Sequence, residues 1–217
     1  MSIVDHHKLK TEKTGHIYSI ANPQAFRHWM LCHGYAMTAE QIVHKFKDLD
    51  EDNNFYYAPE ALSSFYYEGD TQNIPVASWM TSRHRLDEIA DYSHYLNTCL
   101  NYFSKNVSRV LFGFSQGATT LWRFINAIKP DFDIFINWAG DIPDNTEYDT
   151  DYLKGKKLIY VYGDNDKYLS LERIDNLKWR CQKLELDVFF HSFKGEHRVD
   201  RKYLRMIYER HVTTHKI

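Results

Sequence analysis

Short apolar runs recur along the chain, and amphipathic segments separate most of them. The runs are rich in aromatic and β-branched residues, as buried strands are. They occupy residues 16–21, 28–32, 54–58, 107–112, 133–139, 157–162 and 187–193. Strand patterns that alternate with helix patterns are typical of a mostly parallel sheet flanked by helices on both faces. We therefore predict an α/β fold with about seven strands, in which the first two runs can form an antiparallel pair.

Helix-period segments fit between these runs, at residues 38–49, 83–103, 116–128 and 170–185, and a last helix is expected to start near Val199. Thr38 and Gln41 have the spacing of a capping box, and Ser170 is a suitable N-cap. Residues 59–81 show no clear period and form a longer irregular stretch than a compact domain normally carries. We predict that this stretch is a functional loop, acting as a lid or as part of a pocket.

The amino-acid composition mainly excludes several classes of protein. The 217 residues contain no internal repeat and no linker-like stretch, so we expect a single domain over residues 1–217. Lys plus Arg number 27 and Asp plus Glu 29, a balance that gives no electrostatic reason to expect a nucleic-acid partner. Three widely spaced cysteines argue against a disulfide framework or a structural zinc site. A polar N-terminus and the lack of any run approaching ~20 apolar residues predict a cytoplasmic protein with no strong membrane signal.

The most informative local signal is Gly113-Phe114-Ser115-Gln116-Gly117, which has the pattern Gly-x-Ser-x-Gly between a predicted strand and a predicted helix. The chain must reverse within very few residues there, so Ser115 is expected in a strained conformation with small neighbours at Gly113 and Gly117. Such a turn presents the hydroxyl at the carboxyl edge of the sheet, above the N-terminus of a helix. We predict that Ser115 is a nucleophile.

A serine hydroxyl needs a general base, which is itself oriented by an acid. In this topology the acid and then the base follow the nucleophile along the chain. His197 lies a few residues after the last predicted strand and is the expected base, whereas His191 falls inside that strand. Asp166 follows the preceding strand and is the favoured acid, with Asp141 and then Asp164 as alternatives.

An oxyanion hole requires two N–H donors. The backbone N–H of Gln116, directly after the nucleophile, is the first candidate. The second is the backbone N–H of Tyr35, in the loop that follows the second predicted strand. His33 in the same loop is expected to support the loop by hydrogen bonding.

Aromatic and apolar side chains gather in or beside residues 59–81, among them Phe65, Trp79 and Met80. Trp138 ends a neighbouring predicted strand. Loops at the sheet edge usually form the pockets of serine hydrolases, so we predict that these residues bind an acyl group or a small aromatic ester. The alternative interpretation is that the same rings pack the segment against the sheet.

These motifs resemble the α/β-hydrolase superfamily, and within it the small phospholipase/carboxylesterase group that includes acyl-protein thioesterases. The resemblance extends from His33-Gly34 to the His197 loop, and the Gln after the nucleophile is its most specific feature. It departs from the family at Ala36, where a second glycine is usual. The resemblance implies hydrolysis of carboxylic esters or thioesters, with no metal and no cofactor.

We therefore predict a serine carboxylesterase-like enzyme that forms an acyl-enzyme on Ser115 and acts on small or short-acyl substrates. Its partner would be a small-molecule ester or thioester. Four alternatives stay open: a thioesterase, an acyltransferase with an alcohol acceptor, a lysophospholipase-type acyl hydrolase, and a non-catalytic binding module that retains the fold. The histidines show no ligand-spaced cluster such as His-Glu-x-x-His, which disfavours a metal hydrolase. The sequence does not predict an oligomeric state.

Overall fold

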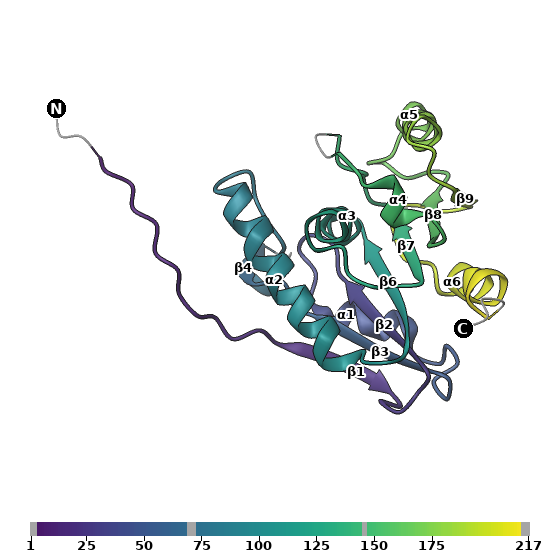
Figure 1. Cartoon of the computed structure of the whole chain (residues 1–217), viewed down its shortest axis with the longest axis horizontal. Coiled ribbons are helices and arrows are strands. Elements are labelled where there is room, and N and C mark those ends of the chain that lie inside the picture. Colours follow the sequence, from purple (N-terminus) through teal and green to yellow (C-terminus); the bar gives the residue numbers. More distant parts are fainter. Residues whose placement is uncertain (1–3, 69–72, 145–146, 214–217) are drawn as a thin grey trace.

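The computed structural model describes residues 4–68, 73–144 and 147–213 and is built around a seven-stranded sheet. In spatial order the strands are β1 (Ile17–Ala21), β3 (Asn54–Pro59), β2 (Arg27–Cys32), β6 (Ser108–Phe114), β7 (Ile134–Trp138), β8 (Lys157–Gly163) and β9 (Val188–Phe193). All neighbouring pairs from β3 to β9 are parallel, and β1 is antiparallel to β3. Helices lie on both sides of this sheet (Figure 1). The predicted α/β class with a mostly parallel sheet is confirmed.

The predicted pairing of the first two strands is wrong, because β1 pairs with β3 and not with β2. Every residue of β2 is buried, and β3 and β6 hydrogen-bond to its two edges. β1 is only partly buried, which suits a strand at the edge of the sheet. The short connection between the two strands therefore crosses over β3 instead of forming a hairpin.

The helices are α1 (Ala39–Val43) with a 3₁₀ turn (His44–Phe46), α2 (Arg85–Phe103), α3 (Gln116–Ile128), α4 (Thr150–Leu153), α5 (Leu171–Lys183) and α6 (Arg201–Ile207) with a π-helical turn (Tyr208–Val212). The predicted caps form: Thr38 and Gln41 make both bonds of the capping box, and the Ser170 hydroxyl accepts the Arg173 N–H at 3.2 Å. The single turn α4 was not predicted, since four residues carry too little periodic signal.

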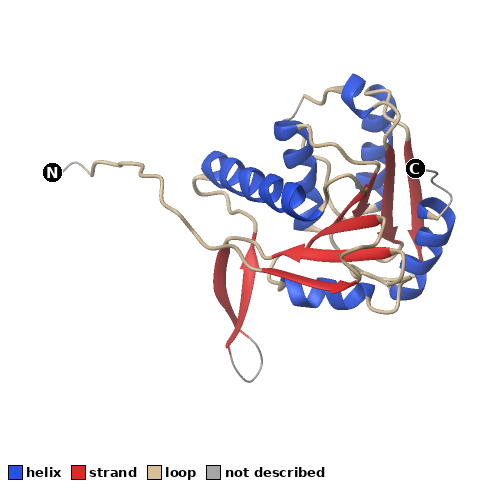
Figure 2. Ribbon diagram, turned by 60° about the horizontal axis from the view of Figure 1, so that its bottom comes forward, coloured by secondary structure: helices blue, strands red, loops and turns tan. Residues whose placement is uncertain are grey.

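Residues 59–81 are more regular than the sequence suggested. They contain an antiparallel hairpin of β4 (Ser63–Glu68) and β5 (Asn73–Ser78), which forms a sheet of its own. Figure 2 shows the two strands projecting from the body of the molecule. Three consecutive aromatic residues at 65–67 hide the alternation of a strand, and Pro75 reads as a strand breaker although an edge strand tolerates it.

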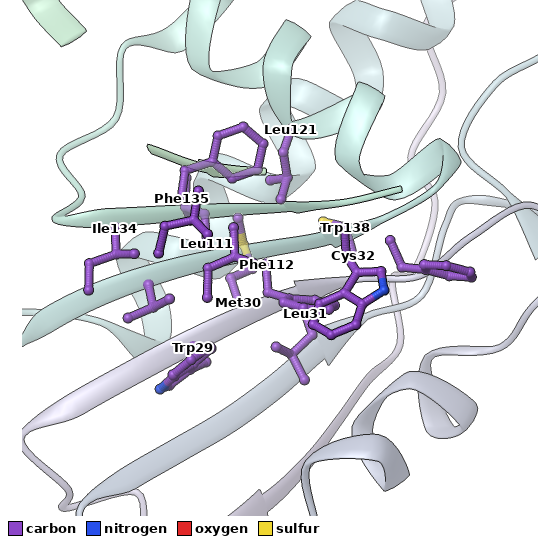
Figure 3. Packing of buried hydrophobic residues seen from close by; sticks show 14 of the residues in the cluster. Trp29, Met30, Leu31, Cys32, Leu111, Phe112, Leu121, Ile134, Phe135 and Trp138 are labelled. Carbon is purple, nitrogen blue, oxygen red and sulfur yellow. The ribbon is translucent and has the colours of Figure 1, made fainter. Parts of the chain in front are cut away.

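The hydrophobic core fills the space around β2, β6 and β7 (Figure 3). Trp29, Phe112 and Trp138 are fully buried there. The register pairs Cys32 with Gly113 and Phe114 with Trp138, so the three strands end together at one edge of the sheet. The loops that follow these strands are thereby brought side by side.

Candidate active site

Ser115 lies in a tight turn at this edge, between the last residue of β6 and the first residue of α3. Its backbone angles, φ of 53° and ψ of −118°, lie in a region that residues other than glycine rarely adopt. A Cβ on Gly113 would lie 2.4 Å from the Cα of Ala118, and one on Gly117 would lie 2.2 Å from the carbonyl oxygen of Cys32. Both glycines are therefore needed for the close approach that holds the turn.

The Ser115 hydroxyl lies within hydrogen-bonding distance of a histidine and, through it, of a buried carboxylate. Ser115 Oγ is 2.8 Å from His197 Nε2, and His197 Nδ1 is 2.6 Å from Asp166 Oδ2. The Asp166 side chain is fully buried, and its other oxygen accepts the backbone N–H of Tyr168 at 2.8 Å. The three side chains come from the loops after β6, β8 and β9. The carboxylate is thus fixed on both oxygens and can orient the imidazole.

The two alternative acids are engaged elsewhere. Asp141 pairs with the guanidinium of Arg173, whose Nε donates to it at 3.1 Å. Asp164 accepts the backbone N–H of Gly195 at 2.9 Å, which ties the loop after β8 to the loop that carries His197. Of the three aspartates considered, the structure brings only Asp166 to the histidine.

The loop after β2 lies against the turn that carries Ser115. A Cβ on Gly117 would lie 2.5 Å from the carbonyl oxygen of His33, so this loop touches the start of α3. His33 is fully buried; its Nε2 accepts the Ala61 N–H at 3.1 Å and its Nδ1 donates to the Gly34 carbonyl at 2.8 Å. Burial lowers the pKa of His33 to about 4, so the ring is neutral at neutral pH and supports the loop, as the sequence predicted.

The backbone N–H of Gln116 is the first of α3 and therefore has no partner within the helix. Its side chain binds the end of the hairpin: Oε1 accepts the Trp79 N–H at 3.1 Å, and Nε2 donates to the Met80 carbonyl at 2.9 Å. The loop that carries Tyr35 is tied to the same hairpin, because the Ala36 N–H donates to the Ala77 carbonyl at 3.1 Å. The C-terminal end of β5 is therefore hydrogen-bonded both to Gln116 and to the loop of Tyr35, the two residues whose backbone N–H groups are the predicted oxyanion donors.

Two of the four predicted pocket residues are buried inside the protein. Trp79 is 2% exposed and donates its indole N–H to the His33 carbonyl at 2.8 Å. Trp138 is completely buried and donates to the Arg198 carbonyl at 2.8 Å. The assignment of Trp79 and Trp138 to the substrate pocket is therefore corrected, because both rings pack in the core and donate their indole N–H groups to backbone carbonyls of loops.

The other two predicted pocket residues are only partly buried. The Phe65 ring stacks on the ring of Tyr35, with centroids 5.4 Å apart. Met80 contacts Arg123, whose Nη1 is 3.0 Å from its sulfur. Tyr35 itself is 53% exposed, so part of this aromatic pair stays open to a ligand.

Tyr168 is a site residue that the sequence analysis missed. Its ring packs edge-on against the His197 imidazole at 4.7 Å, and Phe114 contacts the same ring at 5.0 Å. A groove of about 600 Å³ runs beside His197, lined by residues 164–171, 196 and 197. Tyr168 follows Asp166 by two positions, but no motif marks it.

Within the described ranges, no group of three or more His, Cys, Asp or Glu side chains is arranged to hold a metal ion. None of the helices in the same ranges combines the length and apolar character needed to cross a membrane.

Comparison with solved structures shows that the chain has the α/β-hydrolase fold. The chain is similar to acyl-protein thioesterase 2 of Zea mays, with a TM-score of 0.69 and 12% identity over 90% of this chain and 96% of that one. It is similar to a carboxylesterase of Bacillus cereus, with a TM-score of 0.67 and 13% identity over 90% and 93%. A phospholipase/carboxylesterase of Dyadobacter fermentans matches with a TM-score of 0.66 and 16% identity over 91% and 96%.

The family itself follows from the sequence. Residues 11–204 match the model of the family described as Serine hydrolase (FSH1), so the chain belongs to that family and is a serine hydrolase. A search of curated proteins found no match.

Proposed function

We propose that this serine hydrolase cleaves carboxylic esters with Ser115 as nucleophile, His197 as general base and acid, and Asp166 as the residue that orients the imidazole. The observation that carries the proposal is the unbroken pair of short contacts, 2.8 Å from Ser115 Oγ to His197 Nε2 and 2.6 Å from His197 Nδ1 to Asp166 Oδ2. A base within this distance can remove the hydroxyl proton as the oxygen attacks.

In the proposed reaction, Ser115 Oγ attacks the ester carbonyl carbon while its proton moves to His197 Nε2. The carbonyl oxygen becomes negative, and the backbone N–H groups of Gln116 and Tyr35 stabilise it, aided by the positive end of α3. His197 then gives the proton to the leaving alcohol as the carbon–oxygen bond breaks. Water, deprotonated by the same imidazole, attacks the acyl-enzyme and releases the acid and free Ser115.

Thioesters enter through the same steps, with a thiol as leaving group, and the contacts around the imidazole do not distinguish the two substrates. Comparison of kcat/KM for a p-nitrophenyl ester and for a thioester of the same acyl group measures the preference.

The test is hydrolysis of p-nitrophenyl acetate and butyrate by the wild type, by Ser115→Ala and by a matched control, Ser82→Ala. Ser82 is an exposed serine outside the site. We expect Ser115→Ala to lose about 10⁴-fold or more in kcat and Ser82→Ala to keep wild-type kinetics. Equal rates for Ser115→Ala and the wild type, or no hydrolysis of either ester or thioester by the folded wild type, would overturn the proposal.

A further inference from the structure

The strand β4 forms an outer edge of the hairpin. Within the described residues, β4 pairs with β5 alone, and the two strands form a sheet of their own. Figure 2 shows this hairpin standing away from the body of the molecule. The side of β4 that faces away from β5 therefore presents backbone N–H and C=O groups, and such a row can pair with a strand of another chain.

The bonds of β5 show which residues of β4 direct their backbone groups outward. The Ala77 N–H donates to the Met37 carbonyl at 3.0 Å, and the Ala77 carbonyl accepts the Ala36 N–H at 3.1 Å. Both backbone groups of Ala77 thus point away from β4, so Ala77 and its partner Ser64 form a non-hydrogen-bonded pair. The N–H and C=O of Ser64 consequently point away from β5.

Every second residue of an antiparallel strand has the same orientation, so Tyr66 and Glu68 also direct their backbone groups outward. Pro75, the partner of Tyr66, agrees with this pattern, because its nitrogen has no hydrogen to donate to β4. A proline or several charges usually protect an exposed edge. β4 contains no proline, and its one charged residue, Glu68, stands at its end.

The outward row of Ser64, Tyr66 and Glu68 is complementary to itself. When two copies of β4 run antiparallel with Tyr66 opposite Tyr66, Ser64 of each copy lies opposite Glu68 of the other, and all three residues exchange hydrogen bonds. A shift by two residues leaves part of the row without a partner. We propose that the protein forms a symmetric dimer in which the β4 strands of two copies pair in this register and build a four-stranded sheet across a twofold axis.

One face of the paired strands brings aromatic rings together. Phe65 of each copy lies opposite Tyr67 of the other, and aromatic cross-strand pairs stabilise a sheet. Tyr67 is 51% exposed in the single chain, so the pairing removes apolar surface from water. Phe65 also stacks on Tyr35, with ring centroids 5.4 Å apart. The interface therefore adjoins the loop that carries the second proposed oxyanion donor.

The opposite face joins the two Tyr66 rings and two polar pairs. Tyr66 is 73% exposed in the single chain and meets its own copy at the twofold axis. The Ser64 hydroxyl can donate to the Glu68 carboxylate of the second copy. The two Glu68 residues lie four positions apart along the paired strands, about 13 Å, so their repulsion is weak.

Cysteine cross-linking tests the register. In the proposed pairing the two Tyr66 Cα atoms lie about 5.5 Å apart, within reach of a disulfide, whereas the two Ser64 Cα atoms lie about 13 Å apart, beyond it. The native cysteines, Cys32, Cys99 and Cys181, are buried. With oxidised glutathione as the oxidant, we expect Tyr66→Cys to form a covalent dimer on a non-reducing gel at least about tenfold faster than Ser64→Cys.

Ser64→Cys is the matched control, because Ser64 is exposed on the same face of the same strand. Equal rates of cross-linking in the two variants, or no covalent dimer from Tyr66→Cys, would overturn the proposal.

The mass of the protein in solution tests the dimer itself. By light scattering after size-exclusion chromatography, we expect the concentrated wild type to have twice the chain mass of 25.9 kDa and to dissociate on dilution, since the interface is small. Tyr66→Lys places two ammonium groups opposite each other and should be a monomer. The matched control, Tyr102→Lys, replaces a tyrosine that is 77% exposed on α2 and should remain a dimer.

Circular dichroism of each variant reports whether the substitution alters the fold. A wild-type mass that stays at 25.9 kDa up to about 1 mM protein contradicts the proposed dimer. A dimer that persists in Tyr66→Lys, or one that is lost equally in Tyr102→Lys, shows that β4 is not the interface. The pairing requires no turnover, so these results are independent of the proposed esterase function.

Discussion

Replacing Gln116 by Ala tests how the proposed oxyanion hole is held in place. The substitution keeps the backbone N–H at the start of α3 but removes the side-chain bonds to the end of the hairpin. In the wild type, Oε1 accepts the Trp79 N–H at 3.1 Å and Nε2 donates to the Met80 carbonyl at 2.9 Å; the variant loses both bonds. The base of β5 also holds the loop of Tyr35, through Ala77. The link between the two donor segments is therefore weakened while both donors remain.

The magnitude follows from the bonds that are lost. The bonds to the Trp79 N–H and the Met80 carbonyl, at about 1 kcal/mol each, predict that the free energy of unfolding falls by about 2 kcal/mol, and the longer contacts with the Ser78 hydroxyl at 3.3 and 3.4 Å add little to this loss. For a chain of this size that corresponds to a decrease in Tm of about 4–8 °C. A misplacement of about 1 Å in a catalytic arrangement can cost about 10²-fold, so we expect kcat to fall by roughly 10- to 100-fold. KM should change little, because the oxyanion forms only in the transition state.

The assay is steady-state hydrolysis of p-nitrophenyl butyrate, with Gln41→Ala as the control. Gln41 has the same side chain and makes the capping box of α1, outside the site. Both variants lose stability, but only Gln116→Ala should lose kcat. If kcat falls no further in Gln116→Ala than in Gln41→Ala, the side chain has a structural role alone and the reasoning is refuted.

Three further predictions concern the acid, the turn and the buried loop histidine. Asp166→Asn should lower kcat by about 10³–10⁴-fold, whereas Asp164→Asn, which can still accept the Gly195 N–H, should change it little; similar losses in both would remove Asp166 from its role. Gly117→Ala should lower the free energy of unfolding in urea by roughly 1–3 kcal/mol through the clash with the Cys32 carbonyl, and an unchanged midpoint would contradict this. His33 has a pKa of about 4 in the folded protein against 6.5 unfolded, so its stabilisation is complete above pH 6.5 and is lost as the pH falls toward 4. It amounts to about 3 kcal/mol at most, and urea unfolding of His33→Gln should show a correspondingly weaker decline between pH 7 and 4.5 than the wild type.

The sequence was sufficient for features that local pattern controls. The cap at Thr38 and the helix that starts at Gln116 lie where the residues predict them, because side-chain capping and hydrophobic period act over a few neighbours. The pairing of β1 was predicted wrongly, because strand order is set by tertiary pairing. Both edges of β2 are occupied by β3 and β6, so β1 pairs with β3. The hairpin of β4 and β5 was missed because consecutive aromatic residues conceal its alternation.

The candidate site divides in the same way. Ser115, Asp166 and His197 could be selected from a turn motif and from loops at the ends of successive strands, since parallel strands bring such loops to one edge. The pocket could not be selected in this manner. Residue type does not tell whether the Trp138 ring faces the core or a ligand, and only tertiary packing shows that it is buried. Tyr168 carries no motif at all, and its contact with His197 is visible only in three dimensions.

Peptide mass spectrometry of the protein after reaction with a fluorophosphonate probe identifies the residue that attacks the carbonyl carbon. Fluoride leaves as the serine oxygen bonds to phosphorus, so the adduct marks the nucleophile itself. We predict one adduct per chain, on Ser115, and strongly slowed labelling in His197→Ala. An adduct on another residue, or none on the folded wild type, would contradict it.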